Sequence, residues 1–196
     1  LRKDRDIHDI CNIFARINQK GMRLSTFDLM NAFLYPHEIK LRKRWERFDN
    51  TQLKGVDRSM NEYLLKLISL HKQAYCSSKY IYNLIPEEKT KKRSESGEIE
   101  EVILVPDSDE FIALWKKACH YGEKARDMIM NVGKHNFGAV KSKFIPNTTI
   151  VPVLGAVLWE RARFGDVSSF GEALEEWYWS ATLSGDYSGS SDTVMA

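Results

Sequence analysis

The sequence predicts a mainly α-helical protein, an irregular multi-helix bundle. Along several segments the apolar residues recur three and four positions apart, which is the period of an amphipathic helix. Strand-like character is confined to the short stretch of residues 102–105. Of the 196 residues, 43% are hydrophobic and 29% are charged, so the chain has enough apolar material to form a core. Together these observations favour a bundle of packed helices.

The first predicted helix ends near Gly21, because glycine is typical of a helix C-terminus. Its apolar residues have helical spacing: Ile7, Ile10, Cys11, Phe14 and Ile17. A second helix over residues 26–33 is expected to begin at Ser25, since Ser25 and Asp28 have the spacing of a capping box. After a break at Pro36, residues 37–48 are expected to form a basic helical stretch.

The middle of the chain changes character after its next helix. That helix is predicted from residues with good periodicity: Met60, Tyr63, Leu64, Leu67, Ile68 and His71. Residues 87–101 are basic at first and then acidic, with no apolar period. Such a segment buries little apolar surface to offset the entropy of ordering, so we expect a mobile charged loop there.

Three helices are predicted in the last part of the chain. Residues 111–132 carry a continuous apolar seam that includes Gly122, where a neighbouring helix can approach closely. Residues 150–163 are apolar almost all round, as in a central buried helix. The final helix is expected to begin at a capping box of Ser169 and Glu172. Its predicted buried face comprises Phe170, Leu174, Trp177 and Ala181, while Trp179 points toward another helix or a partner domain.

No motif in this sequence indicates catalysis. The chain has no H-E-x-x-H, G-x-S-x-G or P-loop pattern, and its three cysteines form no C-x-x-C pair. We therefore predict no catalytic residue, no metal site and no cofactor in this chain. It has no apolar run near the roughly 20 residues that span a bilayer, and no signal peptide. A cytoplasmic protein with reduced thiols and no membrane contact is the expected class.

The strongest candidate for binding is a basic run, residues 40–47. Four of its cations share one side of a helix: Lys40, Lys43, Arg44 and Arg47. With Arg42 they are candidate nucleic-acid contacts, because such a cluster neutralises several phosphates. Trp45 either packs inward or stacks on a base. The alternative is an ordinary solvated helix face.

Two stretches resemble the GmrSD-type restriction endonuclease family. Residues 13–34 match its F-x-R-I-N-x-x-G-x-x-L-S-x-x-[DE]-L pattern at nine positions: Phe14, Arg16, Ile17, Asn18, Gly21, Leu24, Ser25, Asp28 and Leu29. Residues 177–179 resemble its W-[FY]-W motif, and residues 184–188 resemble S-x-R-Y-S. Asp186 replaces the usual arginine of that second motif, which leaves any role of the arginine open.

The resemblance implies a larger parent protein that restricts modified phage DNA. Family members have an N-terminal ParB/sulfiredoxin-like domain, whose D-G-Q-Q-R motif hydrolyses a nucleotide and is missing here, and many have an HNH-like nuclease domain. Residues 1–34 would then be the tail of a truncated α/β ParB-like domain, followed by a helical domain over residues 35–196. The rest of the ParB-like domain, the nuclease domain and DNA would be its partners. A nucleoside triphosphate and a divalent metal would be cofactors of the parent protein only.

Under this resemblance, Phe14 and Asn18 support the nucleotide pocket of the complete protein. The alternative for Asn18 is a helix cap with no other role. The chain itself is then a non-catalytic helical segment of a nucleotide-dependent endonuclease. Two alternatives remain at this point: a stand-alone helical module that binds nucleic acid, and a protein-interaction module.

Overall fold

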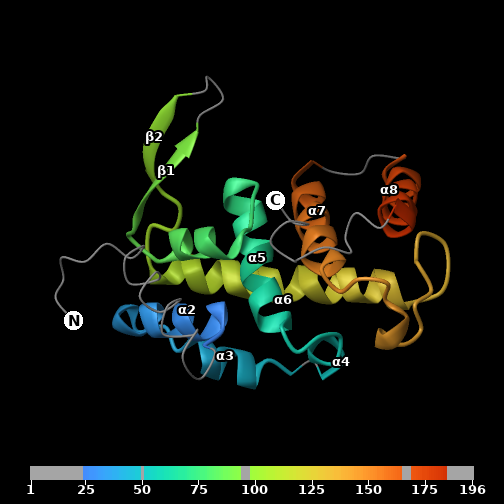
Figure 1. The fold of residues 1–196 in the computed structure, drawn as a ribbon, viewed down its shortest axis with the longest axis horizontal. Coiled ribbons are helices and arrows are strands. Elements are labelled where there is room, and N and C mark those ends of the chain that lie inside the picture. Colours follow the sequence, from blue (N-terminus) through green and yellow to red (C-terminus); the bar gives the residue numbers. More distant parts are fainter. Residues whose placement is uncertain (1–23, 50, 94–97, 165–168, 185–196) are drawn as a thin grey trace.

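A computed structural model describes residues 24–49, 51–93, 98–164 and 169–184. The described chain is mainly helical, as predicted, with one two-stranded sheet. Its centre is formed by α5 (Met60–Gln73), α6 (Ser108–Met130) and α7 (Ile150–Phe164), which all contact one another. In Figure 1, α6 runs along the length of the molecule and α5 crosses it.

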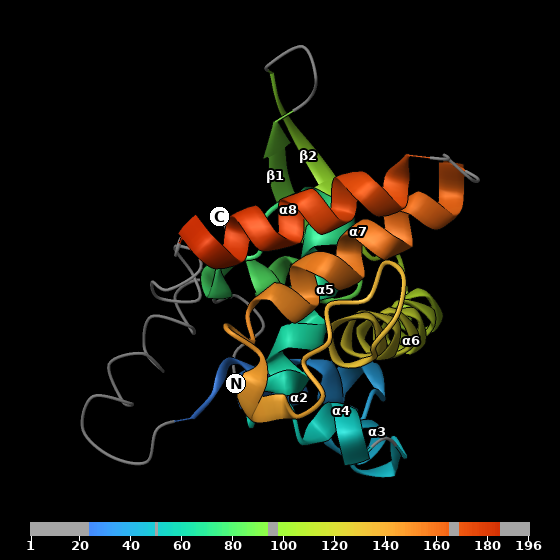
Figure 2. The same ribbon diagram turned by 90° about the vertical axis from the view of Figure 1, so that its right-hand side faces the viewer.

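The smaller elements surround this centre. On one side of α6 lie α2 (Thr26–Leu34), α3 (Leu41–Arg47) and α4 (Thr51–Lys54). On the opposite side lies α8 (Phe170–Ser184), which Figure 2 shows above α7. Short 3₁₀ helices connect the larger elements: η1 (Tyr35–His37), η2 (Ser78–Leu84) and η3 (Ser142–Phe144).

The predicted cap of α2 is confirmed. The backbone N–H of Asp28 donates to the Ser25 hydroxyl at 3.2 Å, and the Ser25 N–H donates to the Asp28 carboxylate at 3.1 Å. These two bonds satisfy donors that a helix N-terminus otherwise leaves unpaired. Phe27 and Leu34 are buried, and the Phe27 ring lies 6.3 Å from that of Trp115 on α6. The cap therefore positions a helix that shares the common core.

The helix predicted over residues 37–48 is interrupted. Glu38 adopts a left-handed backbone conformation with φ of 61°, and α3 begins only at Leu41. Ile39, between them, is fully buried, and its N–H donates to the carbonyl of Leu34 at 3.1 Å. Burying Ile39 requires a turn that a continuous helix would not allow, so tertiary packing overrides local helix preference here.

The loop predicted over residues 87–101 is largely a β-hairpin. Strand β1 (Lys89–Arg93) pairs antiparallel with β2 (Ile99–Ile103), while residues 94–97 lie outside the described ranges. The register places Lys91 opposite Glu101, and the Lys89 ammonium lies 3.2 Å from the Glu101 carboxylate. The basic and acidic halves of the segment therefore attract each other across the strands, an effect that a search for apolar periodicity does not detect.

The close approach predicted at Gly122 is confirmed. A Cβ at this position would lie 2.8 Å from Leu64 Cδ2 of α5. A second close contact occurs at Gly155 of α7, where a Cβ would lie 2.5 Å from Leu67 Cδ1. The expected burial of α7 is also confirmed, since Val151, Leu154 and Trp159 are all buried. Two glycines thus allow the three central helices to pack closely.

The buried face of α8 differs from the prediction in its aromatic residues, and Phe170 is only half-buried. Tyr178 is buried, whereas Trp177 is half-buried. Tyr178 stacks on Phe137 with ring centroids 3.7 Å apart, so the connection before α7 decides which ring faces inward. Trp179 is 46% exposed, and its ring lies edge-to-face with that of Phe137 at 6.4 Å between centroids.

Phe14 and Asn18 lie outside the described residues, as does most of the predicted first domain. Its last helix, α2, packs on α3 and α5. The division of the chain at residue 34 and the roles of Phe14 and Asn18 therefore stay predictions.

Candidate nucleic-acid interface

The basic run lines one side of a hollow between α3 and α6. This hollow, the α3–α6 groove, has a volume of about 670 Å³. All four cations that were predicted to share a helix side line it: Lys40, Lys43, Arg44 and Arg47. Lys40, Lys43 and Arg47 are exposed, and Arg44 is half-buried. Their predicted common direction is confirmed, although their contact with nucleic acid stays a prediction.

The opposite wall of the groove comes from α6. It contributes a further cation, Lys116, together with His120, and both side chains are exposed. These residues lie one helical turn apart on the polar side of α6. Sequence reasoning followed only the apolar seam of this helix and missed them. A search for cations on the polar face of α6 would have identified these residues. It would not have shown that they lie opposite α3.

Positive charge exceeds negative charge around the groove. Five basic side chains line it, from Lys40, Lys43, Arg44, Arg47 and Lys116, against two carboxylates, from Glu38 and Glu123. Among the residues that the structure describes, none of these five cations forms an ion pair. The groove is therefore a region of positive potential that attracts anions.

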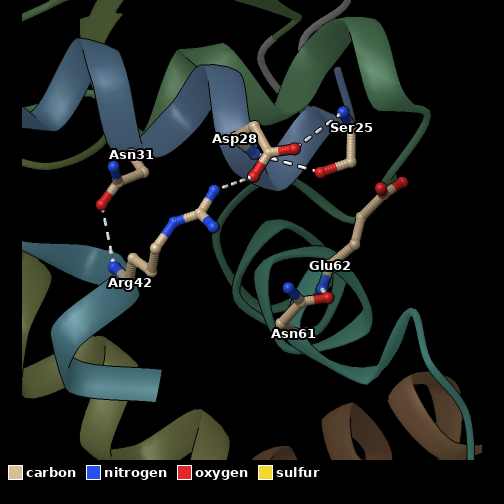
Figure 3. Close-up of polar contacts among 6 residues, drawn as sticks. All are labelled: Ser25, Asp28, Asn31, Arg42, Asn61 and Glu62. Carbon is tan, nitrogen blue, oxygen red and sulfur yellow. Dashed lines mark hydrogen bonds and ion pairs between the residues drawn. The ribbon is translucent and has the colours of Figure 1, made fainter. Parts of the chain in front are cut away.

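Arg42 is separate from this groove. Figure 3 shows its side chain extending toward α2, where the guanidinium forms an ion pair with Asp28. Its backbone N–H donates to Asn31 Oδ1 at 2.8 Å. Asp28 thus caps α2 and also holds α3 against it. Arg42 faces the α2–α3 junction rather than the groove. Its contact with nucleic acid stays a prediction.

Trp45 packs inward, which was one of its two predicted roles. Its ring stacks on Phe48 with centroids 5.9 Å apart and is half-buried against the core. The Lys54 ammonium lies 5.0 Å from the centroid of the Trp45 ring. These contacts anchor α3 to the bundle, so the cations on its other side are held in place.

The base of the groove contains a buried thiol. Cys119 on α6 lines the groove beside Trp115, and both residues are buried. Burial, reinforced by the charge of Glu123, raises the pKa of the Cys119 thiol from 9.0 to about 12. A thiol with this pKa is protonated at neutral pH and is a poor nucleophile. Cys119 therefore serves as part of the core beneath the groove.

The described ranges contain no cluster of three or more His, Cys, Asp and Glu side chains arranged to hold a metal ion. In the same ranges, every helix is too short or too polar to cross a bilayer.

The fold and the groove define a mainly helical protein with a basic surface hollow. The chain is 27% identical over 186 residues to an uncharacterised protein of the archaeon Methanocaldococcus jannaschii. The match covers 93% of this chain and 28% of that relative, so the chain spans less than a third of the relative's length. No protein-family model matches the sequence, and no solved structure gives a significant match.

Proposed function

We propose that this chain is a non-catalytic helical segment that binds the phosphate backbone of nucleic acid through the α3–α6 groove. The observation that carries the proposal is the convergence of five cations, from α3, the residue before it and α6, on one hollow. A cation without a carboxylate partner is available to neutralise a phosphate and release its counterion. Phosphate contacts of this kind position a protein on nucleic acid without reading its sequence.

The dimensions of α3 suit a phosphate chain. Lys40 and Arg47 are seven positions apart, which corresponds to about 10 Å along a helix. Successive phosphates of one strand in a duplex are separated by about 3.4 Å along the axis, so the run faces roughly three of them. The cations of α3 are mostly exposed, as is Lys116, so a polymer has access to them. An extended anion therefore fits this arrangement better than a single small one.

In this proposal the segment works within a longer cytoplasmic protein of the GmrSD type. The two sequence stretches that resemble this family support it, because they occur in the family's order. Other parts of the parent protein would hydrolyse the nucleoside triphosphate with a divalent metal and cleave DNA. The groove would hold DNA for them. The presence of a D-G-Q-Q-R motif in the parent reading frame tests this part independently of the binding experiment.

The binding proposal is tested by neutralising charge in the groove. The variant Lys40→Gln/Lys43→Gln/Arg47→Gln removes three positive charges from exposed side chains. Binding to a fluorescent DNA duplex is measured by anisotropy at several salt concentrations. If each residue neutralises one phosphate, the slope of log affinity against log salt should become shallower by about 0.9 for each substituted residue, or about 2.7 in total.

A matched control removes the same charge elsewhere. Lys91→Gln/Lys141→Gln/Lys143→Gln changes three exposed lysines that do not line the groove. It should leave the salt slope almost unchanged. Equal decreases of affinity in the two variants would show a non-specific charge effect, and no binding by the unchanged protein would reject the proposal.

A protein-interaction role is the second candidate, favoured by apolar exposure on α8. Trp179 is 46% exposed and Leu183 is 81% exposed, and their spacing of four places them on one side of the helix. Monomeric proteins seldom expose large apolar side chains together. If this face is an interface within the longer protein, Trp179→Ser/Leu183→Ser should raise the solubility of the isolated chain and disrupt assembly with the remaining parts. Normal assembly would contradict this role.

A further inference from the structure

A second hollow lies farther along α6 and is built from three separate segments. This hollow, the His135 pocket, has a volume of about 590 Å³. Its walls come from the later turns of α6, from residues 134–136 and from the last turns of α7. Its size lies within the range of about 300–1,000 Å³ that is usual for pockets binding small molecules.

The polar lining of the pocket favours an anion. Lys124, Lys134 and Arg161 supply three positive charges, and Asn136 supplies a side-chain amide. The one carboxylate in the lining belongs to Asp127, which lies 2.8 Å from the guanidinium of Arg126 and is therefore already neutralised. Lys124 and Lys134 form no ion pair among the residues that the structure describes. Cations from three segments thus line one volume. The guanidinium of Arg161 also lies 4.3 Å from the centroid of the Phe170 ring on α8.

His135 is held in this wall by an unusual backbone conformation. Its φ is 63°, in the left-handed region that side chains other than glycine rarely adopt. Its Nδ1 lies 2.8 Å from a carboxylate oxygen of Glu175 on α8. The ring also packs on Gly171, where a Cβ would lie 2.7 Å from Nδ1. Backbone strain that is maintained by such contacts is a common feature of binding sites.

The connection that carries His135 is tied back to α6. The N–H of Phe137 donates to the carbonyl of Met128, and the N–H of Ala139 donates to that of Ile129, both at 2.9 Å. With Nδ1 engaged by Glu175, Nε2 is the ring nitrogen that is left for a ligand. The backbone that carries the imidazole and the amide of Asn136 is therefore held against α6.

The remaining walls are apolar or aromatic. Tyr121 and Met128 of α6 and Leu158 of α7 line the pocket. From this combination we propose that the His135 pocket binds a small phosphomonoester with a flat, weakly polar group, such as a mononucleotide. Lys124, Lys134 and Arg161 bind the phosphate with His135 and Asn136, and the apolar walls contact the flat group. This site is independent of the α3–α6 groove, because the two hollows share no lining residue.

The proposal is tested by calorimetry with adenosine 5′-monophosphate on the full chain. Adenosine and inorganic phosphate, which each represent one part of this ligand, are measured separately for comparison. The monophosphate should bind more tightly than either part. The variant Lys124→Gln/Lys134→Gln should weaken its binding at least about tenfold, because each lysine supplies a charge-assisted hydrogen bond.

Three controls separate this site from general charge effects and from the groove. Lys141→Gln/Lys143→Gln removes two exposed charges outside the pocket and should leave binding unchanged. A groove variant, Lys43→Gln/Arg47→Gln, should also leave it unchanged, so failure of one site does not imply failure of the other. His135→Gln should weaken binding without loss of the thermal transition. Binding of adenosine as tight as that of the monophosphate, or equal weakening in the pocket and control variants, would overturn the proposal.

Discussion

The two basic hollows along α6 differ in how their charges are assembled. The α3–α6 groove takes four of its five cations from one continuous run, and most of these side chains are exposed. The His135 pocket takes its three cations from α6, the following connection and α7. Cations in one run suit a long, variable anion, whereas cations that converge from several segments suit one small ligand. On the two proposals, hollows of similar charge would therefore recognise different ligands.

The largest expected effect concerns the base of the groove. Because burial raises the pKa of Cys119 from 9.0 to about 12, its thiolate fraction at neutral pH should be about a thousandfold lower than that of an ordinary thiol. Alkylation of Cys119 by iodoacetamide should be correspondingly slow in the folded protein and rapid in urea. Peptide mass spectrometry over time measures both rates.

The same pKa shift has a consequence for stability. The folded protein retains the Cys119 proton that the unfolded chain releases, so this contribution to stability is complete below pH 9 and is lost as the pH rises toward about 12. Rapid alkylation of Cys119 in the folded protein at neutral pH would contradict the burial of this thiol at the bottom of the groove.

Gly155→Ala should disturb the His135 pocket and not the groove. The added Cβ would lie 2.5 Å from Leu67 Cδ1 and 3.3 Å from the carbonyl of Tyr121, which lines the pocket. Leu67 is fully buried and has little room to move, so overpacking should lower the free energy of unfolding by about 1–3 kcal/mol. Urea unfolding measures this decrease. A more stable variant would mean that Leu67 moves easily, since alanine is the better helix former by about 1 kcal/mol.

Gly171→Ala should affect the His135 pocket more selectively. Its Cβ would lie 2.7 Å from Nδ1 of His135 and would displace the ring from Glu175. We expect adenosine 5′-monophosphate to bind several-fold more weakly, with unfolding free energy changed by less than about 1 kcal/mol because the helix propensity improves. Ser180→Ala, at an exposed position of the same helix, is the control. Unchanged binding in Gly171→Ala would show that His135 does not need its present position.

The smallest expected effect distinguishes two arginines of the basic run. Arg42→Gln removes the ion pair between Arg42 and Asp28. Because the Arg42 side chain is 56% exposed, solvent screens this pair, and the free energy of unfolding should decrease by about 0–1 kcal/mol. DNA affinity should change little. Arg47→Gln should do the reverse, lowering DNA affinity with stability unchanged. Equal loss of DNA affinity in the two variants would show that DNA contacts both sides of α3, and not only the side that lines the groove.

Local patterns were sufficient to predict the main helices and part of the groove. Ser25 and Asp28 form the expected capping box because both partners lie within four positions of each other. Lys40, Lys43, Arg44 and Arg47 face one hollow because helical spacing determines their direction. The contribution of α6 to the groove was not predicted, because the spacing of residues along the chain does not show that Lys116 lies opposite α3.

Where the predictions were wrong, distant contacts decided the structure. The charged segment forms strands because its basic and acidic halves pair with each other. The helix predicted from residue 37 is interrupted at Glu38 because Ile39 is buried in the core. Tyr178 is buried rather than Trp177 because Phe137, 41 positions earlier, stacks on it. Each of these outcomes depends on residues that a single helical period does not connect.

By itself, the sequence determined that this protein is mainly helical, where most of its helices begin, and that one short helix presents a row of cations. Those properties follow from interactions within one or two turns, where spacing and capping residues suffice. Only the tertiary structure decided that α6 closes the groove and that His135, Lys124 and Arg161 surround one pocket. The physical reason is that packing of α5, α6 and α7 through Gly122 and Gly155 brings together residues that are far apart in the chain.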